Sequence, residues 1–337
     1  MGGSCPSFES LPQVVSFGKG FYQFKENHCH QPKNGRGLAR NGLNNKRGER
    51  VKSIASKVAL NAGILVFLIC AGLGLFAYFQ GTAAVLEEAE KALTIQAVEA
   101  ARYVQATVEG HLVSLEAIVA RPDLMRMDWS EQEPVLHSEL ERIGHFQAFG
   151  VVDLTGFVRL TDGTTAEVKD RPYFIEAMKG NSSVSDLVVS RADGTLVLVN
   201  AAPIKDKGQI VGVLIATQNG AVLSQITDRL GFGVSGSAFI FHRDGTLFAH
   251  DKAEYIFEQR NIFSDRGNLA PVGTVIQELG SNTGVVSYTL DGAAHMSGLA
   301  PIPGTDWIIA VGAMEDEVLG NIEQLGRLLI IISLAFV

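Results

Sequence analysis

An uncharged stretch of 22 residues, from Val58 to Phe79, constrains the fold of this chain more than any other feature. At about 1.5 Å per residue, a helix of this length reaches roughly 33 Å. The hydrocarbon core of a bilayer is about 30 Å thick, so such a helix is long enough to cross it. The sequence therefore predicts a transmembrane helix over residues 58–80.

Charge is distributed unevenly on the two sides of this segment. Residues 1–57 hold ten lysines and arginines against three acidic residues, whereas residues 58–337 hold 18 basic and 33 acidic residues. The positive-inside bias predicts a basic cytoplasmic tail over residues 1–57 and places residues from 81 onward outside. Because contacts to phosphates need clustered Lys and Arg, the acidic exterior argues against a nucleic-acid partner.

A second apolar segment closes the sequence. Residues 328–337 are apolar except for Ser333, but a segment this short does not span a bilayer. We interpret it as the start of a truncated second transmembrane helix. Residues 314–327, which precede it, are expected to form an exit helix.

The sequence offers little for metal binding or catalysis. The cysteines are Cys5, Cys29 and Cys70, so the exported part depends on its core rather than on disulfides. His28 and His30 flank Cys29, but no spaced second pair follows, and we expect coil there and no metal or cofactor. Residues 231–236 spell GxGxxG after a predicted helix and before a strand, which is typical of a linker loop and not of a dinucleotide site. Catalysis is not expected.

A long amphipathic helix is expected after the membrane. Apolar residues recur every three or four positions from Val85 to Val119, and Pro122 ends the pattern. The apolar stripe is rich in alanine, so the helix packs on its own domain, pairs with a second copy in a homodimer, or does both. A shorter helix over residues 131–143 completes a helical stalk over residues 81–145.

The pattern changes to that of β-strands at Phe149. A hairpin, a short helix and three further β-rich runs follow, at residues 149–160, 171–179, 184–189, 196–201 and 210–217. Five strands with helices to one side predict an α+β module with an antiparallel sheet, over residues 146–222.

A second module of the same kind is expected over residues 223–313. Residues 238–250 repeat the first hairpin, and Ala300-Pro301-Ile302 repeats Ala202-Pro203-Ile204 98 positions later. Matching order, spacing and strand context predict a tandem pair of related modules.

These residues carry a family resemblance. The segments Asp170-Arg-Pro-Tyr-Phe174, Ala201-Ala-Pro-Ile204 and Gly212-Val-Leu214 resemble the membrane-distal half of a double Cache sensor domain, and Gly233–Ile240, Asp244-Gly-Thr246 and Ala300–Gly304 resemble its membrane-proximal half. The resemblance covers roughly residues 81–325. It implies two PAS-like modules with antiparallel sheets beside a long N-terminal helix. Such domains are the extracytoplasmic sensors of bacterial chemoreceptors, histidine kinases and diguanylate cyclases.

The same resemblance implies a ligand site in the distal module, formed by Arg171, Tyr173, Phe174, Ser190 and Thr217. An arginine fork suits a carboxylate, because two parallel charge-assisted hydrogen bonds fix its orientation. The alternative is that Arg171 forms only local bonds and that Tyr173 belongs to the core.

Three of these positions depart from the pattern of amino-acid-binding family members. Those members have a tryptophan where this chain has Tyr173, and two aspartates where it has Ser190 and Thr217. Without two carboxylates, the desolvation of a buried ligand ammonium would go uncompensated. An amino acid is therefore disfavoured, and a carboxylate, another small polar molecule or no direct ligand remains open.

On this basis we expect the sensing and transmembrane part of a dimeric receptor of the bacterial inner membrane, with its sensor periplasmic or extracellular. It would signal to cytoplasmic machinery through a region beyond residue 337. A chemoreceptor is the first expectation, and a histidine kinase or diguanylate cyclase sensor is the alternative. A secreted solute-binding protein, with Val58–Phe79 as signal peptide, is an alternative of another class, but signal peptides have apolar regions of only about 7–15 residues.

Overall fold

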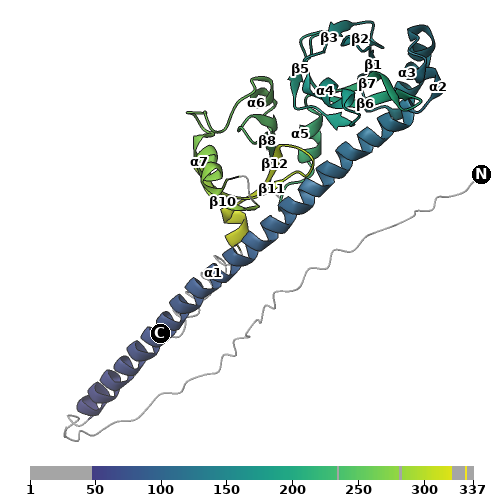
Figure 1. Ribbon diagram of the computed structural model, residues 1–337. Helices are drawn as coiled ribbons and strands as arrows, with labels where there is room; N and C mark the ends of the chain where they lie inside the picture. Colours follow the sequence, from purple (N-terminus) through teal and green to yellow (C-terminus); the bar gives the residue numbers. More distant parts are fainter. Residues whose placement is uncertain (1–47, 234, 281–282, 321–330, 332–337) are drawn as a thin grey trace, which may run out of the picture. The chain divides into compact units, whose positions relative to one another are not determined.

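The computed structural model describes residues 48–233, 235–280, 283–320 and 331 (Figure 1). The predicted basic tail and second apolar segment lie almost entirely outside these ranges. The chain divides into two units, Met1–Ala59 and Leu60–Val337. Of the first unit only residues 48–59 are described, and they are helical. The second unit contains both predicted modules.

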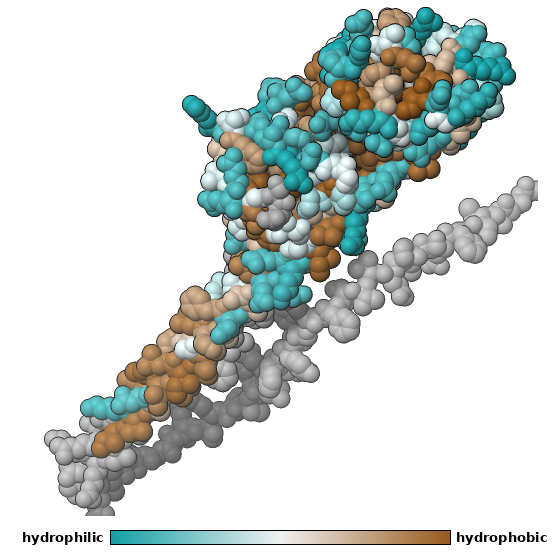
Figure 2. Space-filling view, in the orientation of Figure 1, coloured by the Kyte–Doolittle hydropathy of each residue, from teal (hydrophilic) through white to brown (hydrophobic). Residues whose placement is uncertain are grey.

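Helix α1 runs without interruption from Gly48 to Val119. The two helices predicted at 58–80 and 85–119 are thus one helix, because no proline separates them and a single glycine such as Gly81 costs a helix only about 1 kcal/mol. Among the described residues, one helix, Ser56–Val119, is long and apolar enough to cross a membrane by length and composition. Its apolar side chains near the N-terminal end are exposed, which gives the brown lower part of the helix in Figure 2.

The second half of α1 has the predicted buried stripe. Leu93, Ala97, Val104 and Leu115 are fully buried. The stretch from Ala97 to Val108 shares a core with the second sheet and with parts of the first, and Leu115 to Val119 share a core with the first sheet. The alanine-rich seam therefore serves packing within the chain, one of the two uses expected for it.

Two short helices follow α1. α2 (Pro122–Met125) begins at the proline that ends the long helix, and α3 (Trp129–Ile143) corresponds to the predicted second helix. The Asp128 carboxylate caps α3 by accepting a hydrogen bond from the Ser130 backbone N–H at 3.0 Å. Gly144 ends α3 in the left-handed conformation at φ 75°.

The first module is built on an antiparallel sheet with strand order β3-β2-β1-β7-β6-β4, in which β5 also pairs with β6. The strands are β1 (Ala148–Val152), β2 (Phe157–Leu160), β3 (Thr165–Glu167), β4 (Ser183–Val184), β5 (Val188–Val189), β6 (Leu196–Asp206) and β7 (Gln209–Asn219). The run predicted as one strand at 184–189 is divided into β4 and β5. Helix α4 (Pro172–Met178) covers the sheet face opposite α1, with its buried residues in a separate core.

The second module repeats this plan with strand order β10-β11-β12-β8-β9. Its elements are α5 (Val222–Thr227), β8 (Ala238–His242), β9 (Leu247–Ala249), α6 (Ala253–Phe257), α7 (Ala270–Leu279), β10 (Gly284–Leu290), β11 (Ala293–Pro301) and β12 (Trp307–Met314). Pro203 of β6 and Pro301 of β11 lie on corresponding strands. β6 pairs with β7 and β11 pairs with β12, and in each case the partner is the last strand of the module along the sequence. Residues 315–320 continue from β12 as helix. The fold is α+β, as predicted.

Candidate functional site

The site predicted in the first module lies between α4 and the sheet, on the face opposite α1. Arg171 is the N-cap residue of α4, with Pro172 at the first helical position. Its extended backbone (φ −74°, ψ 133°) directs the chain into the helix. The guanidinium Nη2 donates a hydrogen bond to the Val189 carbonyl at 2.8 Å, and thereby links the start of α4 to β5.

Four of the five predicted residues surround one small cavity. Arg171, Tyr173, Ser190 and Thr217 line a space of about 30 Å³, together with apolar side chains of the sheet. A cavity of this size has room for about one water molecule. The fifth residue, Phe174, does not line the cavity and is buried in the adjacent core. The structure thus brings together residues that are up to 46 positions apart in the sequence.

The sequence left two roles open for Tyr173, a wall of the ligand site and a residue of the core, and the structure is compatible with both. It is buried in the core and also forms part of the cavity wall. Burial raises the pKa of its phenol to about 12. The hydroxyl is therefore protonated at physiological pH and available as a neutral hydrogen-bonding group.

Ser190 and Thr217 form local hydrogen bonds. The Ser190 Oγ accepts a hydrogen bond from the Ala192 N–H at 3.2 Å, and the Thr217 hydroxyl donates to the Ala148 carbonyl at 3.3 Å. Both side chains are short and neutral, so neither can balance the charge of a ligand. The Ser190 hydroxyl also hydrogen-bonds to the Asp193 carboxylate, and the Thr217 hydroxyl oxygen retains the capacity to accept a further hydrogen bond.

Arg191 is a residue of this site that the sequence reasoning missed. It lines the same cavity, and its guanidinium forms a bidentate pair with the Asp170 carboxylate at 2.6 and 2.7 Å. This pair lowers the pKa of Asp170 to about 2. The available signal was the position of Arg191 next to Ser190, but an ion pair across 21 positions of sequence cannot be read without the fold.

The cavity has a consistent chemical character. Two guanidinium groups lie at its edge, the rest of its lining is apolar or neutral, and no acidic side chain is among the described residues that line it. Such a site can hold an anionic group by charge-assisted hydrogen bonds. The nearest carboxylates, Asp170 and Asp193, do not line the cavity and are bonded to the lining residues Arg191 and Ser190, so neither is free to pair with a buried ammonium.

The motifs set aside in the sequence have structural roles. Residues 231–233 and 235–236 lie between α5 and β8 outside any helix or strand, in agreement with the predicted linker loop. A Cβ at Gly236 would lie 1.8 Å from the Phe232 carbonyl oxygen, so this loop needs glycine for close backbone packing. No group of three or more potential metal ligands occurs among the residues that the structure describes.

Comparison with known proteins identifies the family. Residues 81–322 match the family model of the Cache domain. The chain therefore belongs to the Cache domain family, which agrees with two sheet modules on a long N-terminal helix.

Relatives within the family are chemoreceptors. The chain is 25% identical over 194 residues to the methyl-accepting chemotaxis protein PctB of Pseudomonas aeruginosa, which covers 56% of this chain and 29% of PctB. It thus spans less than a third of that relative. Its structure resembles the ligand-binding domain of the Pseudomonas fluorescens chemoreceptor CtaA in complex with L-isoleucine, with a TM-score of 0.58 and 18% identity over 72% of this chain and 99% of that one.

A second structural neighbour is the sensory domain of the Campylobacter jejuni chemoreceptor Tlp3 with isoleucine bound. The TM-score is 0.54 at 15% identity, over 70% of this chain and 97% of that one. Structural similarity at identities this low shows a shared fold only. The ligand of this chain therefore has to be inferred from its own side chains.

Proposed function

We propose that this chain is the ligand-sensing and transmembrane portion of a bacterial chemoreceptor. Residues 58–79 cross the inner membrane, the two Cache modules lie on its outer side, and the receptor signals to cytoplasmic machinery. A small carboxylate binds in the distal module. The receptor acts as a homodimer, with a second copy of the chain as partner.

One observation carries the proposal: α1 is a single helix from the apolar segment to the cores of both modules. A ligand can act across a membrane only if it favours one arrangement of the connecting elements over another. Because Leu93 and Leu115 are fully buried on the same helix, a ligand-dependent movement of either module would displace α1 together with its membrane-spanning end.

The proposed ligand class follows from the two guanidinium groups. A carboxylate on Arg171 would replace the Val189 carbonyl. Arg191 lines the same cavity and would add a second cationic donor once its pair with Asp170 opens. The bound amino acids of CtaA and Tlp3 also carry a carboxylate. No acidic side chain is among the described residues that line this cavity, unlike the pattern of amino-acid-binding family members given above. This favours a carboxylate ligand without an adjacent ammonium.

Binding requires the site to open, since about 30 Å³ does not hold a carboxylic acid. The wall that can move is the segment around β5, which contributes Val188 and Val189. This strand pairs with β6 at two residue positions only, Val188 with Val197 and Val189 with Leu196. Displacing β5 would release Arg171 and enlarge the cavity, so that the ligand and the Val189 carbonyl compete for one guanidinium.

The proposal is tested with residues 1–337 fused to the cytoplasmic region of a chemoreceptor of known output. Small mono- and dicarboxylates should elicit a swimming response, and primary amines should not. Arg171→Ala should abolish the response, whereas Lys207→Gln, at an exposed turn remote from the cavity, should leave it unchanged. A fusion that inserts and dimerises but answers to no carboxylate would refute the ligand class.

Fractionation tests the topology separately. A protein with an N-terminal tag should remain in carbonate-washed membranes at full length. A processed, soluble form would instead support the secreted solute-binding protein.

A further inference from the structure

The second module contains a cavity more than ten times the volume of the distal one. It measures about 370 Å³ and lies between the second sheet and helices α6 and α7. Its walls include residues of the core on the sheet face opposite α1. The two cavities therefore have equivalent positions, because each lies on the face of its module's sheet that is opposite α1. Pockets for small ligands begin at about 300 Å³.

The interior of this cavity suits an apolar group. Phe239, Leu269 and Val272 contribute aliphatic and aromatic surface, and Tyr255 and Tyr288 form further ring walls. Tyr288 stacks on His295 with ring centroids 5.6 Å apart, and its hydroxyl pairs with Ser297 at 2.9 Å. An apolar side chain in this space would be removed from water on several sides.

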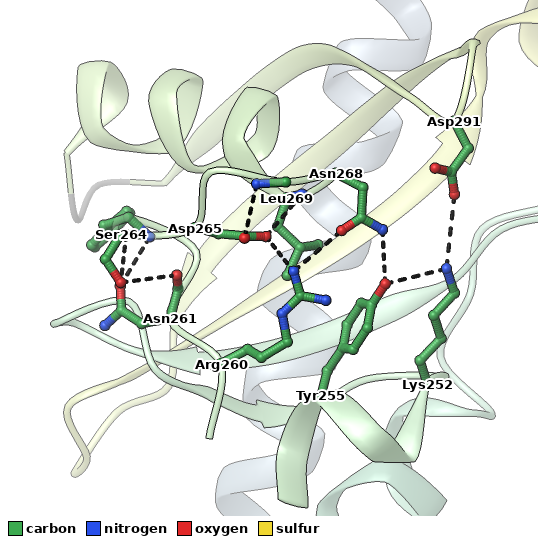
Figure 3. Close-up of polar contacts among 11 residues, drawn as sticks. Lys252, Tyr255, Arg260, Asn261, Ser264, Asp265, Asn268, Leu269 and Asp291 are labelled. Atoms are coloured by element: carbon green, nitrogen blue, oxygen red, sulfur yellow. Dashed lines mark hydrogen bonds and ion pairs between the residues drawn. The ribbon is translucent and has the colours of Figure 1, made fainter. Parts of the chain in front are cut away.

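A polar network fixes one wall in place (Figure 3). The Arg260 guanidinium lies over the Tyr255 ring at 4.0 Å and pairs with the Asp265 carboxylate at 2.5 Å. Asn268 donates a hydrogen bond to the Tyr255 hydroxyl oxygen at 2.7 Å. The Tyr255 ring is thereby held by Arg260 and Asn268, which is the support that a preformed ligand site needs.

Charges of both signs meet at the edge of the cavity. Lys252 precedes α6 and Asp291 lies in the turn between β10 and β11, and Figure 3 shows their side chains pointing toward one another. The Lys252 Nζ lies 3.8 Å from the Asp291 Oδ2 and 3.4 Å from the Tyr255 hydroxyl. Both distances exceed those of a strong charge-assisted hydrogen bond, about 2.7–2.9 Å. A ligand can therefore offer each charge a closer partner than it has now.

We propose that this cavity binds a small zwitterion with an apolar side chain, such as a free apolar α-amino acid. The ligand carboxylate pairs with Lys252, the ligand ammonium pairs with Asp291, and the side chain enters the ring-walled interior. A ligand with one charge would leave either Lys252 or Asp291 without its new partner, so the pair selects for both charges together. This site is independent of the carboxylate site proposed in the distal module.

The test is isothermal titration calorimetry on residues 1–337 in detergent micelles, with titrations into empty micelles subtracted. The probes are L-phenylalanine, 3-phenylpropanoate, which lacks the ammonium, and phenethylamine, which lacks the carboxylate. Because 3-phenylpropanoate belongs to the ligand class proposed for the distal module, the three probes are compared in the Arg171→Ala chain. Phenylalanine should bind, and each single-charge probe should bind at least about tenfold more weakly.

Variants assign the binding to this cavity. Lys252→Gln and Asp291→Asn should each weaken phenylalanine binding about tenfold. The Lys252 and Asp291 side chains are 42% and 62% exposed, and asparagine tolerates the positive φ of 50° at position 291, so both variants should fold. Arg266→Gln removes an exposed positive charge of the same module away from the cavity, and should have no effect.

Three results would overturn the proposal: no binding of phenylalanine, equal affinity for a single-charge probe, or full affinity in both Lys252→Gln and Asp291→Asn. Arg171→Ala separates the two proposed sites. It should leave phenylalanine binding intact, and loss of binding in that variant would place the amino acid in the distal module instead.

Discussion

The Trp307 indole Nε1 donates a hydrogen bond to the Asp186 carboxylate at 2.8 Å, across 121 positions of sequence. Asp186 lies between β4 and β5 of the first module, and Trp307 begins the last strand of the second. Both residues line a cavity of about 420 Å³, together with Pro172 and Tyr173 of α4. The helix that contributes to the distal site therefore lies beside the contact that joins the modules.

The first prediction concerns this contact. Trp307 is 1% exposed, but the Asp186 side chain is 51% exposed and both residues line the cavity, so water can reach the N–H group if the carboxylate is removed. Asp186→Ala should lower the free energy of unfolding by about 1.5–3 kcal/mol, the contribution of a hydrogen bond to a charged group. Asp186→Asn keeps an acceptor oxygen and should lower it by less than about 1 kcal/mol. Differential scanning calorimetry of the chain in detergent measures both, and equal melting temperatures for the two variants would contradict the assignment.

The second prediction concerns pH. His111 of α1 stacks on His145 with ring centroids 4.5 Å apart, and its Nδ1 is buried without a hydrogen-bond partner among the described residues. Burial, and then the nearby His145, lower the pKa of His111 to about 4. The unfolded chain, with a histidine pKa near 6.5, binds the proton more readily than the folded chain. Stability should therefore fall as the pH drops from about 6.5 toward 4.

The melting temperature measured between pH 7 and pH 4 tests this. His111→Phe keeps an aromatic ring against His145 without the titrating group, and should show a smaller loss over this range. The control, His137→Gln, replaces an exposed histidine of α3 and should follow the wild-type curve. A His111→Phe curve parallel to the wild type would exclude His111 as the source.

The sequence predicted the elements whose signals are local. The stripe from Val85 to Val119, the stop at Pro122 and the hairpin at residues 149–160 depend on periodicity and on turn residues. The structure confirms the stop and the hairpin, and buries the stripe from Ala89 onward, whereas Val85 is exposed. The repeat of Ala-Pro-Ile likewise predicted two modules, because equivalent strands carry it. The continuity of α1 was missed, since a change in composition near Gly81 was read as a boundary although nothing there ends a helix.

The candidate site could be predicted only in part. Arg171, Tyr173, Ser190 and Thr217 were found through the family resemblance, and the structure places them together. Arg191 was missed because its role depends on Asp170, which the fold brings beside it. The cavity of the second module gave no signal at all, because Lys252 and Asp291 belong to different elements and meet only when the sheet has formed.

The third prediction concerns packing between α1 and the second sheet. A Cβ at Gly298 of β11 would lie 2.3 Å from the Leu93 carbonyl oxygen, so the strand approaches the helix more closely than an alanine allows. Gly298→Ala should lower the free energy of unfolding by about 1–3 kcal/mol, the usual cost of overpacking.

Gly110 of α1 has no atom within 4 Å of its Cβ position. Gly110→Ala should therefore raise stability by about 0.5–1 kcal/mol. Differential scanning calorimetry of the two variants measures both changes. If Gly298→Ala leaves the free energy of unfolding unchanged, β11 can move away from α1.

The last prediction concerns the competition for Arg191 in the distal module. Asp170 holds this guanidinium in a bidentate pair whose two side chains are exposed to solvent, so screening keeps the contribution of the pair to stability small. Because the pKa of Asp170 is about 2, the pair is intact at every physiological pH. Asp170→Asn removes the negative charge and leaves Arg191 available to a ligand carboxylate. Carboxylate affinity should therefore rise severalfold while the melting temperature changes by only a few degrees, as measured by calorimetry on the same preparation.

The control, Asp162→Asn, replaces an exposed aspartate of the β2–β3 turn that pairs with Thr164 and not with arginine. It should leave the affinity unchanged, and an unchanged or lower affinity in Asp170→Asn would show that Arg191 does not contact the ligand.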